Sequence, residues 1–151
     1  MTLALRMRQE ERAQAALQRG KAEHAAAAED AEQMERAVSL QTSARLARER
    51  QIYQGMCGRS FSAGEIACVD AELRQLDRAA AGLAAQLAAS MRTAETAYGK
   101  VEALRRHFGG LHRARRKWDE LLLLADGRRK ARQALLEELS VSDNSIARPR
   151  S

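Results

Sequence analysis

The chain has 151 residues, a formal net charge of +6, 3% aromatic residues and one proline, Pro149. A globular core of this length would need more aromatic and branched aliphatic side chains than the composition supplies. Alanine, arginine, glutamate, glutamine and leucine dominate. These strong helix formers are typical of long helices and coiled coils, so we predict an all-α protein.

The first predicted helix covers residues 3–54. Its seam, the line of residues expected to face a partner helix, combines two sets of positions seven apart. These are Leu3, Leu17, His24, Ala31, Val38 and Ile52, joined by Ala13, Gly20, Ala27 and Met34. Glu10, Gln41, Arg45 and Arg48 fall on the same lines. Because small seam residues bury little apolar area, we expect this helix to be the less stable partner.

A turn is predicted at residues 55–62. Three glycines and two serines occur within the ten residues from Gly55 to Gly64, a composition typical of a loop. Ser62 is followed three residues later by Glu65, which is the spacing of a capping box. We therefore expect the second helix to begin at residue 63.

The second predicted helix, residues 63–139, carries the strongest pattern in the chain. Heptad positions counted from Ile66 and from Val69 continue to residues 122 and 125, and sixteen of these eighteen residues are apolar. The exceptions are Ser90 and Arg115. The register passes Gly109-Gly110 without a shift, so these glycines soften the helix without ending it. The principal seam residues are Ile66, Val69, Leu73, Leu76, Leu83, Leu87, Val101, Leu104, Phe108 and Leu111.

A short turn makes the two helices antiparallel neighbours. The predicted fold is a long antiparallel two-helix coiled-coil hairpin over residues 1–139, with a longer second helix and a polar, disordered tail at 140–151. Residue i of the first helix should face roughly residue 120 − i of the second. Residues 119–139 then overhang without a partner. Their leucines, at 121–124, 135, 136 and 139, form an exposed apolar stripe that predicts an interaction site.

The positive charge is concentrated in one stretch. Residues 1–54 carry nine basic and eight acidic residues, whereas residues 99–132 carry eleven basic and four acidic residues, a net charge of +7. Such a stretch favours an acidic protein surface or nucleic acid. The alternative is a solvated helix face whose basic residues complement the helix dipole.

The sequence predicts no catalytic, cofactor or metal site, and we expect no enzymatic activity. The histidines His24, His107 and His112 lack metal-ligand spacing, and His24 is interpreted as a polar seam position that helps to fix register. Cys57 and Cys68 are interpreted as free thiols of a reducing compartment, with a disulfide that staples the turn as the alternative. No apolar run is long enough to cross a bilayer, and no secretion signal opens the chain, so a cytoplasmic protein is expected.

The layout of the chain resembles the stalk proteins of type III secretion, the FliJ/YscO family. Two short stretches are similar to its injectisome branch. Leu5-Arg6 followed by Glu11-Arg12-Ala13 resembles an opening Leu-Arg…Glu-Arg-Ala pattern, and Lys117-Trp118-Asp119-Glu120-Leu121 resembles a Lys-Phe-x-Glu-Leu segment. The high alanine content and basic balance depart from that pattern, since relatives are often richer in glutamate, glutamine and lysine.

The resemblance implies a central stalk that inserts the end bearing both termini into a hexameric secretion ATPase. It also implies contacts with the export gate and with secretion chaperones, at the cytoplasmic face of the secretion apparatus. The protein would meet the membrane only through these partners and would take no small-molecule substrate. The ATPase-binding residues expected on this basis are Arg113, Arg116, Lys117, Trp118, Leu121, Leu122, Arg128 and Arg129. Trp118 could close the free end of the hairpin, anchor a partner, or do both.

Two other functions compete with the stalk. One is a nucleic-acid-binding coiled coil, which the basic stretch supports but the scarcity of aromatic residues disfavours. The other is a homo-oligomeric structural tether that buries the overhang by self-association. The stalk hypothesis predicts a monomer in isolation.

Overall fold

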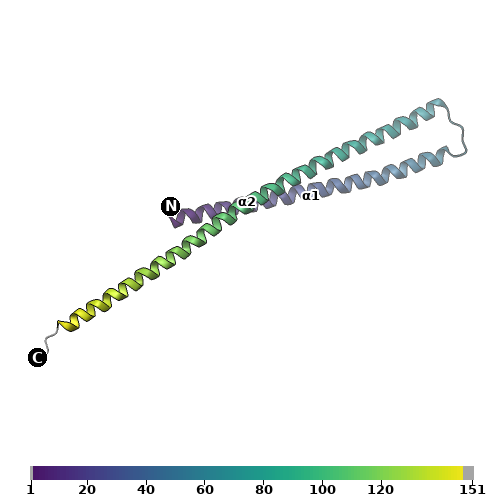
Figure 1. Cartoon of the computed structure of the whole chain (residues 1–151). Helices are drawn as coiled ribbons and strands as arrows, with labels where there is room; N and C mark the ends of the chain where they lie inside the picture. The colour runs from purple at the N-terminus through teal and green to yellow at the C-terminus, as the bar shows by residue number, and fades with distance from the viewer. Residues whose placement is uncertain (1, 148–151) are drawn as a thin grey trace. The chain divides into compact units, whose positions relative to one another are not determined.

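A computed structural model describes residues 2–147, which form two long helices (Figure 1). α1 covers Leu3–Met56 and α2 covers Ala63–Ile146. The described residues contain no strand, and the predicted all-α hairpin with a longer second helix is confirmed. The chain forms two compact units. The turn unit is Ala15–Arg105, and the terminal unit combines the start of α1 up to Gln14 with α2 from Arg106 onward.

The turn between the helices is built from residues that end one helix and begin the next. Gly58 follows the end of α1 with a positive φ of 74°, the left-handed conformation that glycine adopts without steric cost. The Glu65 backbone N–H donates to the Ser62 hydroxyl at 3.2 Å, and the Ser62 N–H donates to Oε2 of Glu65 at 3.0 Å. This reciprocal pair is the predicted capping box. The backbone hydrogen bond from Ser62 lowers the pKa of Glu65.

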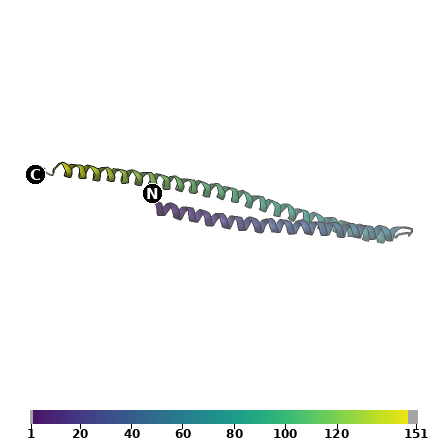
Figure 2. The same cartoon turned by 90° about the horizontal axis from the view of Figure 1, so that it is seen from below.

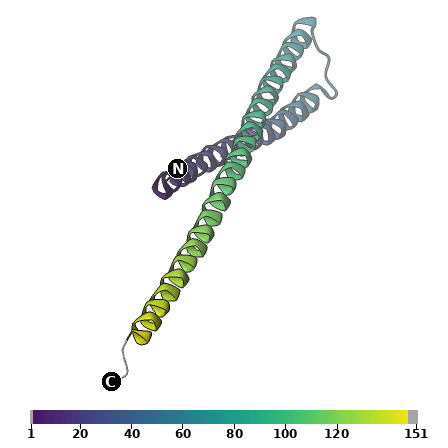
Figure 3. The same ribbon diagram turned by 60° about the vertical axis from the view of Figure 1, so that its left-hand side comes forward.

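In the turn unit, α1 and α2 run antiparallel, as Figures 2 and 3 show, and cross-helix contacts such as the Arg48–Glu72 pair hold them together. The buried side chains there are Leu17, Ile52 and Val101, at 5%, 8% and 4% exposure. Gly20 is also buried, and a Cβ built on it would lie 2.8 Å from Cδ1 of Leu104. The two helices therefore approach closely because small residues of α1 accept large residues of α2.

The seam residues predicted on α2 have reduced exposure along most of the helix. Val101 is buried, and Val69, Leu73, Leu76, Leu83, Leu87, Leu104, Phe108 and Leu111 are half-buried. Ile66 differs, with 52% exposure, because it lies in the first turn of α2 beside the connecting loop. A seam of this kind excludes water incompletely, so the helices are stabilised by many partly buried contacts instead of a closed core.

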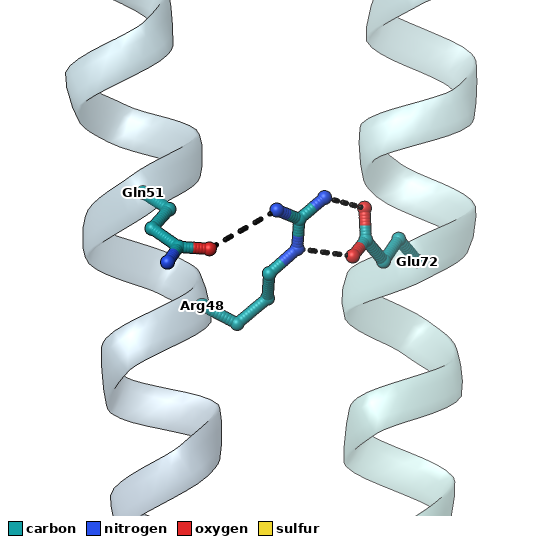
Figure 4. A network of polar contacts seen from close by, with 3 residues as sticks. All are labelled: Arg48, Gln51 and Glu72. Atoms are coloured by element: carbon teal, nitrogen blue, oxygen red, sulfur yellow. Dashed lines mark hydrogen bonds and ion pairs between the residues drawn. The ribbon is translucent and has the colours of Figure 1, made fainter.

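Polar residues on the α1 seam find charged partners on α2 (Figure 4). Arg48 forms a two-bond contact with Glu72, in which Nη2 donates to Oε2 at 3.1 Å, and its Nη1 donates to Gln51 at 3.3 Å. This hydrogen bonding raises the pKa of Arg48 and lowers that of Glu72. Arg45 pairs with Glu49 on its own helix and with Asp77 across the seam. Polar seam positions here are therefore used for pairing between helices.

α2 ends seven residues later than predicted. Residues 140–146, expected to be part of a disordered tail, are helical, and the Ala147 N–H donates to the Asp143 carbonyl at 3.1 Å. No glycine or proline lies between Gly127 and Pro149, so nothing in that interval stops the helix. The rest of the predicted tail, residues 148–151, lies outside the described residues.

Candidate functional site

The C-terminal extension, residues 119–146 of α2, is the most exposed apolar segment of the terminal unit. It continues beyond the start of α1 (Figure 1). Its large apolar side chains are half to four-fifths exposed, apart from Leu122 at 47%. They are Leu121, Leu122, Leu123, Leu124, Leu135, Leu136, Leu139, Val141 and Ile146. An apolar surface of this extent marks an interaction site on a protein.

The four leucines at 121–124 surround the helix. Successive residues of an α-helix are about 100° apart, so four in a row point to every side. Their exposures are 56%, 47%, 74% and 62%. We name this ring of side chains the leucine girdle. A single neighbouring helix could cover only part of it.

Where α1 begins, the side chain of Trp118 meets Arg6. The Arg6 guanidinium carbon lies 4.6 Å from the centre of the Trp118 ring, a cation–π contact. Leu3, Arg6, Trp118 and Leu122 together line a small cavity. Trp118 remains 41% exposed. It therefore both closes the paired region and presents apolar surface beside the extension.

Next to this contact, a carboxylate lies inside the seam. Glu10, whose side chain is 12% exposed, accepts contacts from His112 Nδ1 at 2.7 Å and from Arg115 Nε at 2.8 Å. The Arg115 contact is an ion pair without hydrogen-bond geometry. Phe108 stacks on His112, with ring centres 5.9 Å apart and planes inclined by 25°. This Glu10 cluster joins the two helices through charge within the terminal unit.

The predicted ATPase-binding residues are all exposed on α2. Of these, Trp118 and Leu122 come together at the small cavity, whereas the others are spread along the helix. Arg129 forms an ion pair of 2.6 Å with Asp126, and Lys130 reaches the same carboxylate at 3.1 Å. The positive charge of the extension is confined to residues 128–132, which carry four basic residues and no acidic one, and Asp126 offsets only part of it.

The sequence analysis did not predict two contacts between the start of α1 and α2. These are the contact of Arg6 with Trp118 and the contacts of Glu10 with His112 and Arg115. The expectation that residue i faces roughly residue 120 − i already places residue 10 opposite residue 110, close to His112 and Arg115. Glu10 and Arg115 were visible as charged exceptions on two seams, and their opposite signs predict a pair once the seams are joined.

No family model, no curated protein and no solved structure matches the chain. Among residues 2–147, no group of three or more potential metal-ligating side chains gathers, and no helix is long and apolar enough to span a membrane. Cys57 and Cys68 are exposed free thiols, as predicted.

Proposed function

We propose that this protein is a non-enzymatic central stalk or adaptor of a bacterial type III secretion system. The C-terminal extension would insert into the hexameric secretion ATPase, and the protein would link that ATPase to the export gate and to chaperones at the cytoplasmic face of the apparatus. The observation that carries the proposal is the exposed extension of α2, with apolar side chains on every side.

The leucine girdle suits a site that encloses a helix. Exposure of these four side chains to water opposes solubility, and burial of each contributes roughly 1.5–3 kcal/mol when it is complete. A flat or grooved partner would leave at least one of them in water. The lumen of a ring contacts an inserted helix from all directions, so it can cover the complete girdle.

The charge distribution supports an acidic lumen. Arg113, Arg116 and Lys117 precede the girdle on α2, whereas Arg128 and Arg129 follow it, and all five are exposed. Basic residues on both sides of an apolar ring would speed the encounter with an acidic surface and would fix the depth of insertion. This arrangement agrees with the resemblance to the FliJ/YscO family, which was drawn from the sequence alone.

The test is ATP turnover by the purified secretion ATPase of the same genome, with and without this protein, at physiological salt. We expect stimulated turnover or hexamer formation, and we expect both to be lost with Trp118→Ala or with a chain that ends before Leu121. Leu40→Ala is the matched control, because Leu40 is 72% exposed and lies in the turn unit. No stimulation and no complex at micromolar concentrations would refute the stalk.

A nucleic-acid-binding coiled coil is the second candidate, favoured by the net charge of +7 over residues 99–132. Its signature would be binding to duplex DNA or to RNA that weakens steeply as salt rises, because phosphate contacts release counterions. Charge-neutral changes in the leucine girdle would leave that binding intact. The ATPase interaction, in contrast, depends on the girdle.

A further inference from the structure

The heptad register of α2 continues into the C-terminal extension. Counting by seven from the hairpin seam gives three layers in the extension. Leu122 and Ala125 form the first apolar layer, Arg129 and Arg132 form a basic layer, and Leu136 and Leu139 form the second apolar layer. The apolar layers are separated by fourteen residues, which is four turns of helix, and the arginines lie halfway. The extension therefore presents a ready-made face for another helix.

A second copy of the chain fits this face in shape but not in charge. In an antiparallel pair, Leu122 lies opposite Leu139 and Ala125 opposite Leu136 when the facing residue numbers sum to 261. The same register places Arg129 of each copy opposite Arg132 of the other, so four arginines meet in the central layer. A parallel, in-register pair places each arginine opposite its own equivalent. Like charges that face one another across an interface destabilise it, so self-association of two copies is disfavoured in both orientations.

The carboxylates nearby do not remove this excess charge. Asp126 pairs with Arg129 at 2.6 Å and with Lys130 at 3.1 Å, and it carries one negative charge against two positive ones. Among residues 2–147, Arg128 and Arg132 form no ion pair. The middle of the face is therefore positive, and a helix that binds it must bring negative charge to that layer.

We propose that the extension binds an acidic α-helix of a partner protein. That helix carries apolar residues fourteen positions apart to cover the two apolar layers, and carboxylates between them to pair with Arg129 and Arg132. Arginine forms the strongest such pairs, because its planar guanidinium matches a carboxylate with two hydrogen bonds. The inference rests on the binding role proposed for the extension, but not on the partner's being a secretion ATPase.

The position of the charges favours a protein helix over a membrane surface or nucleic acid. A helix that lies on anionic lipid carries basic residues on its polar face, opposite a continuous apolar face. Here Arg129 and Arg132 interrupt the apolar line itself. Asp126, Glu137 and Glu138 lie on neighbouring faces of the same segment, and they would repel phosphate groups.

A charge-reversed copy of the chain supplies the acidic helix with the required spacing. The variant Arg129→Glu/Arg132→Glu keeps both apolar layers and replaces the basic layer with carboxylates. Wild type, variant and their equimolar mixture are measured by sedimentation equilibrium at micromolar concentrations and 150 mM salt. We expect the mixture to form a one-to-one complex at least tenfold tighter than either self-association, and we expect it to be lost when Leu136→Ala is added to both chains.

The matched control is Arg78→Glu/Arg92→Glu, which makes the same change in charge at exposed positions of the turn unit. This variant should not associate with wild type, and circular dichroism should show equal helix content in all chains. Three results would overturn the proposal. They are dimerisation of wild type alone, equal association with the control, and absence of the mixed complex while wild type binds phosphatidylglycerol vesicles or duplex DNA. Lack of ATPase stimulation would refute the stalk and leave this result unaffected.

Discussion

Leu17→Ala measures how much the sparse seam of the turn unit stabilises the hairpin. Leu17 is 5% exposed and is one of only three large side chains buried in that unit. Truncation of a buried leucine to alanine costs about 2–5 kcal/mol. A two-helix seam can close partly around the missing atoms, so we expect the lower part of that range, about 2–3 kcal/mol. Leucine and alanine have nearly equal helix propensity, which leaves packing as the cause.

The assay is urea unfolding followed by the helical circular dichroism signal at 222 nm. Leu40→Ala is the control, since it makes the same chemical change at a side chain that is 72% exposed. A surface change of that kind shifts the free energy of unfolding by no more than about 0.5 kcal/mol. The difference between the two variants isolates the contribution of seam burial.

Equal free energies of unfolding for the two variants would refute the reasoning. In that case α1 would not be packed on α2 at Leu17. A cost well above about 3 kcal/mol would also contradict it, because the interface would then behave as a rigid core that cannot relax.

The remaining predictions concern a close approach, a helix cap and an ion pair. Gly99→Ala, at a position with open space around it, should stabilise the helix by about 1 kcal/mol. Gly20→Ala should stabilise it less, because the new Cβ would lie 2.8 Å from Cδ1 of Leu104. Thermal unfolding of the two variants measures the difference. Ser62→Ala should cost about 1 kcal/mol in urea unfolding through loss of the cap. The hydrogen bond from Arg48 lowers the pKa of Glu72 below its ordinary value of 4.5. The stability that this pair contributes is therefore complete above pH 4.5 and is lost as the pH falls further. Glu72→Gln should weaken the acid dependence of the free energy of unfolding, measured between pH 7 and pH 3.

The fold follows from the sequence because the pattern of α2 is long and regular. The predicted helix limits at 54 and 63 agree with the observed end at Met56 and start at Ala63. Facing residues can be compared within each unit. Near the turn, Arg48–Glu72 sums to 120 and Arg45–Asp77 to 122. In the terminal unit, Glu10–His112 sums to 122 and Glu10–Arg115 to 125. The predicted sum of 120 is therefore correct to within two residues near the turn and low by two to five residues in the terminal unit.

The contacts of Glu10 with α2 and the end of α2 were harder to predict. Heptad counting scores Glu10 and Arg115 as separate defects, because the count treats each helix alone and ignores charge across the seam. The end of α2 was placed at 139 because the segment that begins at Ser140 is polar. An α-helix continues as long as its backbone hydrogen bonds are made and no residue breaks it, and the first proline is Pro149.

The charged residues on the α1 seam explain how a seam rich in small residues can still hold one register. Alanine and glycine layers pack nearly as well after a slip of one heptad, because their side chains differ little in size. Arg48 fixes α1 through Glu72 in the turn unit, and Glu10 does so through His112 and Arg115 in the terminal unit. A slip would separate the Glu10 carboxylate, which is only 12% exposed, from both of its partners, and an unpaired buried charge is costly. The Arg48–Glu72 pair is more exposed, so its contribution to the register is smaller. Opposite charges thus specify the hairpin, and like charges at Arg129 and Arg132 keep the extension free for a different helix.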